Sequence, residues 1–559
     1  MPPKIAYITT MNFSYAERPA FWDKLTTTYW DLLIIGGGIT GAGIALDAAL
    51  RGWKVALVEK QDFAAGTSSR STKLIHGGLR YLKQFEFKLV HETGTERAII
   101  HHLAPHLVQP EDMLLPIVEG GVLGKMGTRI GLWVYDKLAG VKDYEAFQML
   151  SEKDTLNAEP MLQKEGLLGG ALYTEYRTDD ARLTLSIIKT AVSKGAVCLN
   201  YAEVSDFCYE NEKITGFQLT DRHTGKTHTA KAQVVVNAAG PWVDTLRQKD
   251  KSLEGKRLHL TKGVHIVIPY ERLPLRQSVY FDVADGRMMF AVPRIDKVYL
   301  GTTDTNYTGE KESPNIMQEE VNYLLKAVNQ VFPQAELLEN DIESSWAGLR
   351  PLIHEEGKSP SELSRKDEIF ESDSGLISIA GGKLTGYRKM AERIVDLVGK
   401  RLEEKNVIPF TPDCKTANMR LVGGDFGEPP IAIFMGKIYA KYGKLQPSMK
   451  FISYLIHLYG TESTEILDRA LAWQEKGLSN EEAMLAAELQ FCVEKEMTLT
   501  IADFLIRRTG KLYFDRPNIA VILPLIQKYM SLFTGADSPA MAKQSAEWQV
   551  LYESARKWG

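Results

Sequence analysis

The sequence is poor in cysteine and has no long uninterrupted apolar run. Among 559 residues there are four cysteines, Cys198, Cys208, Cys414 and Cys492, and none of them stands in a CxxC arrangement. This spacing argues against a zinc site and against a disulfide framework, and it fits a reducing compartment. No stretch approaches about 18 consecutive apolar residues, so we expect no membrane-spanning helix. The first residues lack a basic start followed by an apolar core, so they predict no secretory signal.

The chain also lacks a large excess of charge of either sign. Its formal net charge is −4, with 25% charged and 44% hydrophobic residues, as in an ordinary globular protein. This balance gives no electrostatic reason to expect a nucleic-acid partner. The length exceeds what one hydrophobic core usually serves, so we expect about two or three domains.

Residues 31–60, DLLIIGGGITGAGIALDAALRGWKVALVEK, predict a βαβ unit that binds a dinucleotide. Residues 32–35 and 54–58 have the apolar character of buried strands. Residues 39–51 are rich in alanine and leucine, which favours a helix between the two strands. The order of strand, glycine turn, helix and second strand is more specific than a glycine motif alone.

Each glycine of this unit has a predicted role. Gly36 allows the tight turn, Gly38 lets the backbone approach a pyrophosphate, and Gly41 lets the helix pack closely on the strand. Glu59 ends the second strand, where a carboxylate accepts hydrogen bonds from the ribose hydroxyls of an adenosine. The motif by itself does not choose between NAD and FAD.

Segments far along the chain are predicted to complete the architecture. Residues 231–244 form a short apolar strand with a small-residue turn, and residues 375–393 form another strand, glycine turn and helix. Both are expected in the nucleotide-binding sheet. Residues 258–349 alternate apolar and polar side chains, which indicates a half-exposed antiparallel sheet over the substrate. From about residue 404 onward, apolar residues at helical spacing predict a separate helical domain.

Several separated blocks resemble one family of flavoproteins. They are GGGITGAGIALDAALRG with Glu59, TSSRSTKLIHGGLRYL from Thr67, DDARL from Asp179, NAAGPWVD from Asn237, KGVHIVIP from Lys262, GTTDT from Gly301, GLRPL from Gly348 and GGKLTGYRKMAE from Gly381. Together they resemble the FAD-dependent glycerol-3-phosphate dehydrogenases of the D-amino-acid-oxidase-like group, and the C-terminal region resembles the cap domain of that family.

The resemblance implies an α/β + α fold. It consists of a Rossmann-like FAD-binding domain of the glutathione-reductase type, assembled from discontinuous segments, an antiparallel-sheet substrate domain and an all-helical C-terminal domain. The expected boundaries are 30–110, 180–257 and 370–400 for the FAD-binding domain, 111–179 and 258–369 for the substrate domain, and 404–559 for the helical domain.

The resemblance also implies FAD as the cofactor and assigns its contacts. TSS hydrogen-bonds along the cofactor, HGGL and GGKLT bring backbone close to the flavin ring, and NAAGPW supplies a further contact. The simpler interpretation of the paired glycines is ordinary turns. The expected cofactor-binding residues are Gly36, Gly38, Gly41, Glu59, Lys60, Thr67, Ser68, Ser69, His76, Gly77, Gly78, Leu79, Ala239, Gly240, Trp242, Gly382, Lys383, Leu384 and Thr385. No metal site is expected.

A phosphorylated substrate requires cations, because a phosphate dianion is costly to enclose without them. By resemblance, Arg80 with Tyr81, Arg365 and Lys383 hold the phosphate of glycerol 3-phosphate, while Arg350 lies nearer the reacting carbon. The alternative for each of these cations is a solvated surface charge, which is the usual state of lysine and arginine.

Oxidation of the substrate to dihydroxyacetone phosphate requires loss of a hydroxyl proton and of a hydride. His265, in KGVHIVIP, is the expected general base, because an unperturbed imidazole has its pKa near working pH. The alternative is a non-catalytic histidine that is buried inside a sheet with its hydrogen bonds satisfied. Arg350 is expected to stabilise the negative charge that develops on the substrate oxygen.

Two classes of electron acceptor are possible for the reduced flavin. The resemblance favours a membrane quinone, whereas dioxygen would make the enzyme an oxidase that produces hydrogen peroxide. A non-catalytic flavin-binding sensor is a further alternative that the fold permits. Residues 114–140 and 20–30 mix apolar and charged side chains and are candidates for a membrane interface, although such stretches more often pack on a core. We expect a cytoplasmic enzyme, peripheral at the inner face of the cell membrane, and leave a homodimer open.

Overall fold

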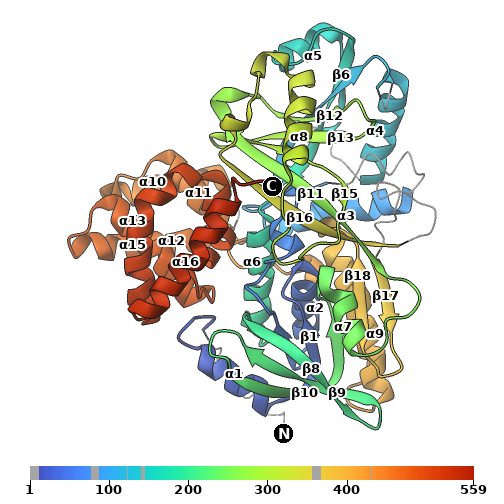
Figure 1. Cartoon of the computed structure of the whole chain (residues 1–559), viewed down its shortest axis with the longest axis vertical. Coiled ribbons are helices and arrows are strands. Elements are labelled where there is room, and N and C mark those ends of the chain that lie inside the picture. Colours follow the sequence, from blue (N-terminus) through green and yellow to red (C-terminus); the bar gives the residue numbers. More distant parts are fainter. Residues whose placement is uncertain (1–11, 77–86, 122–123, 140–144, 355–366, 428–429) are drawn as a thin grey trace.

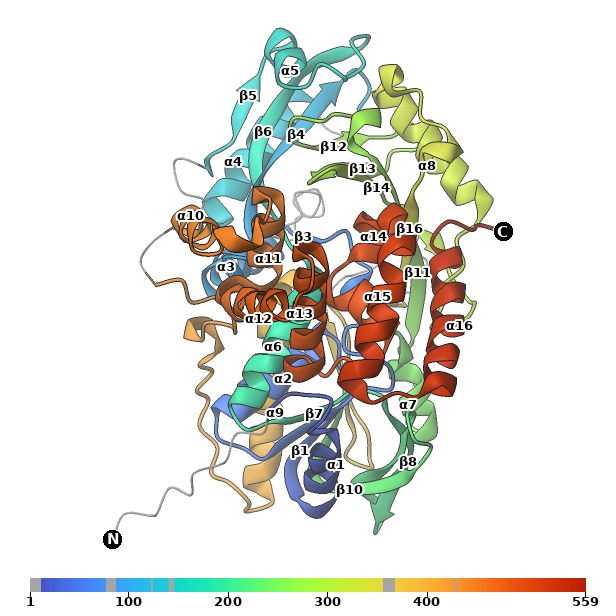
Figure 2. The same cartoon turned by 90° about the vertical axis from the view of Figure 1, so that its left-hand side faces the viewer.

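The computed structural model describes residues 12–76, 87–121, 124–139, 145–354, 367–427 and 430–559. Two sheets occupy opposite ends of the long axis, and the C-terminal helices, orange to red in Figure 1, lie to one side of both. Figure 2, viewed from that side, shows these helices in front of the region where the two sheets meet.

The first sheet has a parallel centre. Its parallel strands are β1 (Tyr29–Ile35), β2 (Val55–Val58), β7 (Val197–Leu199), β10 (Thr227–Asn237) and β18 (Ile377–Gly381). The antiparallel additions are β17 (Asp367–Glu371), β8 (Ala202–Glu210) and β9 (Lys213–Asp221). The associated helices are α1 (Arg18–Thr27), α2 (Ile39–Leu50), α6 (Asp180–Ser193), α7 (Val243–Lys249) and α9 (Tyr387–Glu404). The apolar runs of β1 and β2 follow from this position, because parallel strands are covered on both faces.

The predicted βαβ unit is confirmed, as is the contribution of distant segments to its sheet. β1 pairs with β2 on one side and with β10 on the other, and β10 pairs with β18. The helix α2 packs against α6 and α9, which come from separate parts of the chain. One layered unit is therefore assembled from pieces far apart in sequence.

The second sheet is mixed and mostly antiparallel. Its strands are β3 (Leu74–Ile75), β4 (Gln109–Val118), β5 (Gln148–Leu150), β6 (Leu167–Arg177), β11 (Leu258–Pro269), β12 (Ser278–Asp282), β13 (Met288–Arg294), β14 (Lys297–Gly301), β15 (Thr305–Asn306) and β16 (Ser344–Ile353). The pair β4 and β12 is parallel. The helices of this region are α3 (Phe87–Leu103), α4 (Lys125–Ala139), α5 (Glu152–Ala158) and α8 (Gln318–Val331).

The prediction that β11 has one exposed face is wrong. Val264, Ile266 and Ile268 belong to a core shared with α8, whereas Val267 on the opposite face belongs to the core of the C-terminal helices. Both faces are therefore covered. Alternation in the sequence could not reveal this, because the second cover comes from a domain that begins more than 100 residues later.

The C-terminal helices share a core with the second sheet, which contributes Val267, Val292, Tyr299 and Trp346 to it. They are α10 (Ile431–Lys441), α11 (Met449–Tyr459), α12 (Ser463–Glu475), α13 (Asn480–Lys495), α14 (Lys511–Phe514), α15 (Arg516–Thr534) and α16 (Ser538–Ser554), with a π-helical turn at Asp503–Arg508. The periodicity predicted helices from about residue 404 onward, but the first α-helix of this domain, α10, begins only at Ile431. Pro409 and Pro412 occupy the connection, and proline interrupts helices.

The two predicted membrane-contact segments differ in placement. In the first, residues 20–30, Phe21, Trp22, Leu25 and Trp30 are all buried, so this expectation is wrong. In the second, residues 114–118 are a largely buried part of β4, but α4 exposes an apolar row described below. Across the described ranges, no helix is both long and apolar enough to cross a bilayer.

Candidate functional site

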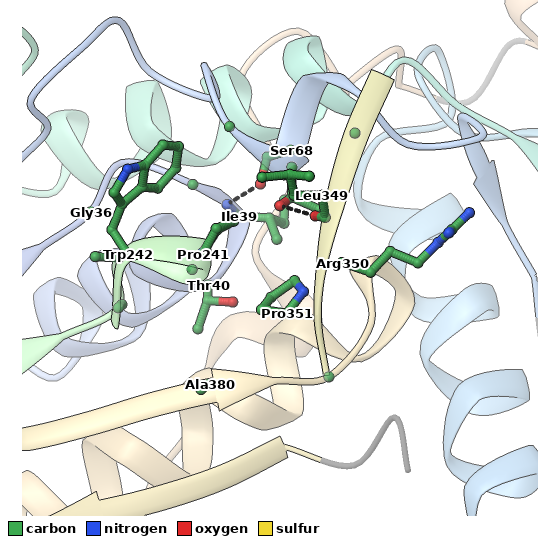
Figure 3. Close-up of a pocket in the computed structure, with 18 of the residues that line it drawn as sticks. Gly36, Ile39, Thr40, Ser68, Pro241, Trp242, Leu349, Arg350, Pro351 and Ala380 are labelled. Atoms are coloured by element: carbon green, nitrogen blue, oxygen red, sulfur yellow. Dashed lines mark hydrogen bonds between the residues drawn. The ribbon is translucent and has the colours of Figure 1, made fainter. Parts of the chain in front are cut away.

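A cavity of about 330 Å³ lies where the two sheets meet. Its wall combines the β1–α2 turn, the end of β2, residues 65–76, the turn after β10, and parts of β11, β16 and the β18–α9 turn. Figure 3 shows Gly36 and Trp242 on one side of the view and Arg350 on the other, where its side chain extends from β16 away from them. The cavity therefore extends from the dinucleotide motif to the second sheet.

The β1–α2 turn has the geometry that its glycines predict. Gly36 has φ +114°, and a Cβ there would lie 2.5 Å from the carbonyl oxygen of Ala238. A Cβ on Gly41 would lie 2.0 Å from the carbonyl oxygen of Gly36. Helix and strand thus approach at a distance that a side chain would prevent.

Hydrogen bonds of the adjacent residues Thr67 and Ser68 connect the start of α2 with the second sheet. The backbone N–H of Ile39 donates to Ser68 Oγ at 2.9 Å, and the Thr67 hydroxyl donates to the carbonyl of Leu349 at 2.7 Å (Figure 3). Ser68 therefore caps the helix, because the N-cap residue Gly38 has no side chain to do so.

Glu59 is held at the end of β2 by backbone donors. Its carboxylate accepts from the N–H of Gly37 at 2.7 Å and of Gln61 at 2.8 Å. Burial raises the pKa of Glu59, and the two N–H donors oppose this shift. Glu59 and Gln61 both line the cavity, so an oriented carboxylate is available there.

A cluster of charges and aromatic rings lies beside this carboxylate. Lys60 pairs with Glu312, and its Nζ lies 4.1 Å from the ring centroid of Trp242. Trp242 Nε1 donates to Glu312 at 2.9 Å, and Arg70 donates to the Glu312 carbonyl at 3.1 Å. Burial lowers the pKa of Arg70, which lines the cavity. Arg70 is a further cation of the site that was not predicted, although it directly follows the TSS block.

The β18–α9 turn brings backbone to the opposite wall. Gly381 and Gly382 have φ +82° and +80°. The Thr385 hydroxyl donates to the carbonyl of His76 at 3.4 Å, and both residues line the cavity together with Lys383. This turn therefore places Lys383 in the same cavity as the dinucleotide motif.

His265 on β11 is enclosed by the ring of Trp346, the hydroxyl of Thr72 and the backbone of Gly301. It stacks on Trp346 with centroids 4.8 Å apart and planes at 10°, and its Nε2 lies 3.1 Å from the Thr72 hydroxyl. Gly301 is its partner on β14, where a Cβ would lie 2.2 Å from the imidazole. The imidazole orientation is thus determined by packing.

The environment of His265 favours the neutral imidazole. Burial lowers the pKa of His265 well below its ordinary value, and the positive charges of Arg350 and Lys73 lower it further. Lys73 is itself buried and forms an ion pair with Asp180 at 2.6 Å. A neutral imidazole at pH 7 can accept a proton.

Arg350 belongs to β16, and its side chain lies over the same face of the second sheet as His265. Its guanidinium donates to Asp304 at 3.1 Å, to the Thr303 carbonyl at 3.2 Å and to the Thr302 hydroxyl at 3.0 Å. A Cβ on Gly263 would lie 2.3 Å from Arg350 Nη2, so the guanidinium passes directly over this glycine. Because Gly263 and His265 are two residues apart on β11, Arg350 and the imidazole lie next to each other on one face.

The structure brings most of the predicted residues to one cavity. The predicted residues that line it are Gly36, Gly38, Glu59, Lys60, Thr67, Ser68, His76, Ala239, Gly240, Trp242, His265, Arg350, Gly382, Lys383, Leu384 and Thr385. Gly41 and Ser69 lie behind this wall. Gly77, Gly78, Leu79, Arg80, Tyr81 and Arg365 lie outside the described residues.

Several residues of this arrangement were not foreseen. Thr72, Trp346 and Asp304 orient the two predicted catalytic side chains, and Gly263 and Gly301 make room for them. The only signal in the sequence was their place inside or beside the quoted blocks. Their roles depend on pairing between strands, which those blocks do not specify.

Comparisons with known proteins agree with this geometry. The profile of the family described as FAD dependent oxidoreductase matches residues 31–388, and that of the C-terminal domain of alpha-glycerophosphate oxidase matches residues 414–539. The chain is 54% identical over 546 residues to the aerobic glycerol-3-phosphate dehydrogenase of Bacillus subtilis (strain 168), covering 97% of this chain and 98% of that protein. It is 51% identical over 508 residues to the protein of that name from Staphylococcus haemolyticus (strain JCSC1435), covering 90% and 91%.

Solved structures show the same relationship. The glycerol-3-phosphate dehydrogenase from Bacillus halodurans, complexed with FAD, is 44% identical with a TM-score of 0.83, covering 98% of this chain and 99% of that chain. The L-alpha-glycerophosphate oxidase from Mycoplasma pneumoniae, with FAD bound, has a TM-score of 0.55 at 18% identity, covering 70% of this chain and 98% of that chain. The second likeness concerns the fold alone.

The residues of the cavity fit FAD. The glycine turn and the N-terminus of α2 suit a pyrophosphate, and the oriented Glu59 carboxylate suits ribose hydroxyls. The backbone of the β18–α9 turn provides a surface for a flat ring. The chain therefore belongs to the FAD-dependent oxidoreductases, in the family of the aerobic glycerol-3-phosphate dehydrogenases.

Proposed function

We propose that this enzyme oxidises sn-glycerol 3-phosphate to dihydroxyacetone phosphate and that a membrane quinone reoxidises the reduced flavin. The observation that carries the proposal is the adjacency of His265 on β11 and Arg350 on β16, on one face of the second sheet, where both line the cavity that fits FAD. The names of the relatives at 54% and 51% identity support the substrate. FAD, when bound, supplies an acceptor for the hydride that leaves the substrate carbon.

His265 takes the hydroxyl proton in this proposal. Its Nε2, which faces the Thr72 hydroxyl, is the nitrogen that accepts the proton. Stacking on Trp346 keeps the imidazole in one orientation, so little motion is needed before proton transfer.

Arg350 stabilises the negative charge that develops on the substrate oxygen. Its contacts with Asp304 and the Thr303 carbonyl hold the guanidinium in place before substrate binds. A preorganised donor of this kind contributes about 3 kcal/mol to transition-state stabilisation.

Lys383 binds the phosphate from the β18–α9 turn, where it lines the cavity. Arg80, Tyr81 and Arg365 complete the phosphate site in the proposal, on the basis of the resemblance alone. A phosphate dianion needs several such partners to replace its hydration.

Helix α4 is the proposed site of peripheral membrane contact. Thr128, Leu132 and Tyr135 face the protein, whereas Met126, Ile130 and Trp133 are 69%, 55% and 57% exposed. The exposed residues recur at helical spacing and therefore form one row. The cations Lys125, Arg129 and Lys137 are also exposed on this helix. An apolar row flanked by cations suits a bilayer with anionic head groups, where a quinone is available.

The test is anaerobic reduction followed by reoxidation. Purified yellow enzyme should bleach when glycerol 3-phosphate is added without oxygen, and a quinone analogue should restore the colour faster than air does. Absorbance of the oxidised flavin measures both steps. Failure to bleach would reject the dehydrogenase proposal and leave the sensor alternative.

Stoichiometric hydrogen peroxide in air would instead support the oxidase. One observation favours this second candidate, namely the match of residues 414–539 to the C-terminal domain described for alpha-glycerophosphate oxidase.

Replacement of Gly263 by alanine should lower kcat about 10- to 100-fold without unfolding the protein. The new methyl group would displace the end of the Arg350 side chain, and a misplacement of about 1 Å is costly to catalysis. Steady-state kinetics and thermal unfolding measure the two effects separately. Gly436→Ala is the matched control, because a Cβ there meets open space. Normal turnover of Gly263→Ala would show that the position of Arg350 does not limit the reaction.

A further inference from the structure

The C-terminal helical domain reaches the βαβ unit through buried charges. The π-helical turn Asp503–Arg508 directs Arg507 and Arg508 to Asp62, which is completely buried. Arg508 donates to the two carboxylate oxygens of Asp62 at 2.6 and 2.9 Å, and Arg507 Nε donates to one of them. Burial alone would raise the pKa of Asp62, but the two guanidinium groups lower it well below its ordinary value.

Asp62 belongs to the segment that begins with the proposed ribose ligand. Glu59 accepts from the N–H of Gln61, and the Gln61 carbonyl accepts from the N–H of Tyr201 at 2.8 Å. Asn200 Nδ2 donates to Asp62 Oδ1 at 2.8 Å. Glu59 and Gln61 line the cavity, whereas Asp62 lies behind them. Contacts at Asp62 therefore act on the cavity wall without reaching the ligand.

Further hydrogen bonds hold the two arginines in place. Arg507 Nη2 donates to Asp503 at 2.6 Å, and Asp503 accepts from the Tyr201 hydroxyl, also at 2.6 Å. Arg508 donates to the backbone carbonyl of Glu496 at 2.9 Å. Buried charges of this kind are tolerated only where each is paired in good geometry, so the network specifies one position of the turn against the segment.

We propose that Arg507 and Arg508 are positioning residues for FAD. Through Asp62 they fix residues 59–62, and this orients the Glu59 carboxylate toward the adenosine ribose. The inference rests on the ribose role proposed for Glu59. It assigns the C-terminal domain a part in retaining the cofactor, through a turn more than 440 residues from the segment that it holds.

The test is FAD release from the Arg507→Lys/Arg508→Lys double variant and from Arg508→Lys alone. Lysine keeps the positive charge but cannot form the paired contact with Asp62. After dilution of the holoenzyme, the rise of flavin fluorescence measures release. We expect the dissociation constant for FAD to rise about tenfold or more, since bonds to a charged group are lost. With FAD at saturation, kcat and the KM for glycerol 3-phosphate should stay within about twofold of the parent.

Arg469→Lys is the matched control, because Arg469 pairs with Glu465 and Glu494 within the C-terminal domain. It should release FAD like the parent. Glu59→Gln separates the ribose role of Glu59 from the positioning role of the two arginines. Normal FAD binding by this variant would refute the ribose role itself. If Glu59→Gln weakens binding while the lysine variants bind FAD like the parent, the positioning role is refuted, whatever their thermal stability. If the double variant does not fold, Arg508→Lys alone decides by the same comparison.

Discussion

Replacement of His265 by asparagine is expected to lower kcat about 1,000-fold while FAD stays bound. A positioned general base contributes roughly 100- to 10,000-fold, and asparagine cannot accept the proton at working pH. The amide is smaller than the imidazole and is compatible with the space over Gly301 and against Trp346. Flavin absorbance and thermal unfolding should therefore remain close to the parent. Turnover within about tenfold of the parent would show that another group removes the proton.

The pH dependence gives an independent check on the same residue. Burial and the nearby cations lower the pKa of His265 below its ordinary 6.5, so the neutral base persists to lower pH than in a free imidazole. The acid limb of kcat/KM, which reports the free enzyme, should therefore fall below pH 6.5. This limb should disappear in His265→Asn. An acid limb above the ordinary value would contradict the assignment of the general base to His265.

Arg350→Lys tests the second predicted catalytic residue in the same assay. Lysine keeps the charge but cannot bridge Asp304 and the Thr303 carbonyl as the guanidinium does. Loss of one donor of this kind costs about 100- to 1,000-fold in kcat. Arg272→Lys serves as the control, because Arg272 pairs with Asp341 and does not line the cavity. A similar loss in both variants would indicate general damage to the sheet.

Loss of the apolar row of α4 is expected to abolish binding to anionic vesicles. In the Met126→Ser/Ile130→Ser/Trp133→Ser variant, three large exposed side chains no longer enter the bilayer interface. Each contributes roughly 1.5–3 kcal/mol when fully buried, so even partial burial predicts a loss of at least about 100-fold. Co-sedimentation with vesicles of phosphatidylglycerol and phosphatidylcholine measures the effect.

The fold should survive these substitutions, because the three side chains point away from the protein core. The matched control replaces Val521, Leu532 and Val550, which are exposed on α15 and α16, by serine. This control should bind vesicles like the parent. Turnover with a soluble dye should be unchanged in both variants, whereas turnover with a vesicle-bound quinone should fall only in the α4 variant. Equal vesicle binding by all three proteins would exclude α4 as the contact.

Addition of salt separates the apolar from the charged part of this interaction. Lys125, Arg129 and Lys137 each contribute about 1 kcal/mol near an anionic surface, and this attraction is screened within about 10 Å at 0.1 M salt. Binding by the parent should therefore weaken, without vanishing, as salt increases.

The site could be predicted where its residues act through local backbone geometry. Gly36 follows β1 directly and has a positive φ, whereas Gly41 lies in the first turn of α2, where the helix packs against the strand. The same holds for Gly381 and Gly382 between β18 and α9. Contacts between segments could not be predicted in this way. Thr72 and His265 are 193 residues apart, and nothing in either block specifies that they meet.

From the sequence alone we could predict the order of strands, glycine turns and helices, the dinucleotide motif, and the residue types available for catalysis. These features depend on periodicity and on backbone conformations that extend over a few residues. The folded chain was needed to show that β11 is covered on both faces, that the apolar side chains of residues 20–30 are mostly buried while one row of α4 is exposed, and that Asp62 contacts Arg507 and Arg508. Such contacts arise from packing between distant segments, and a local pattern contains no information about which partner will cover it.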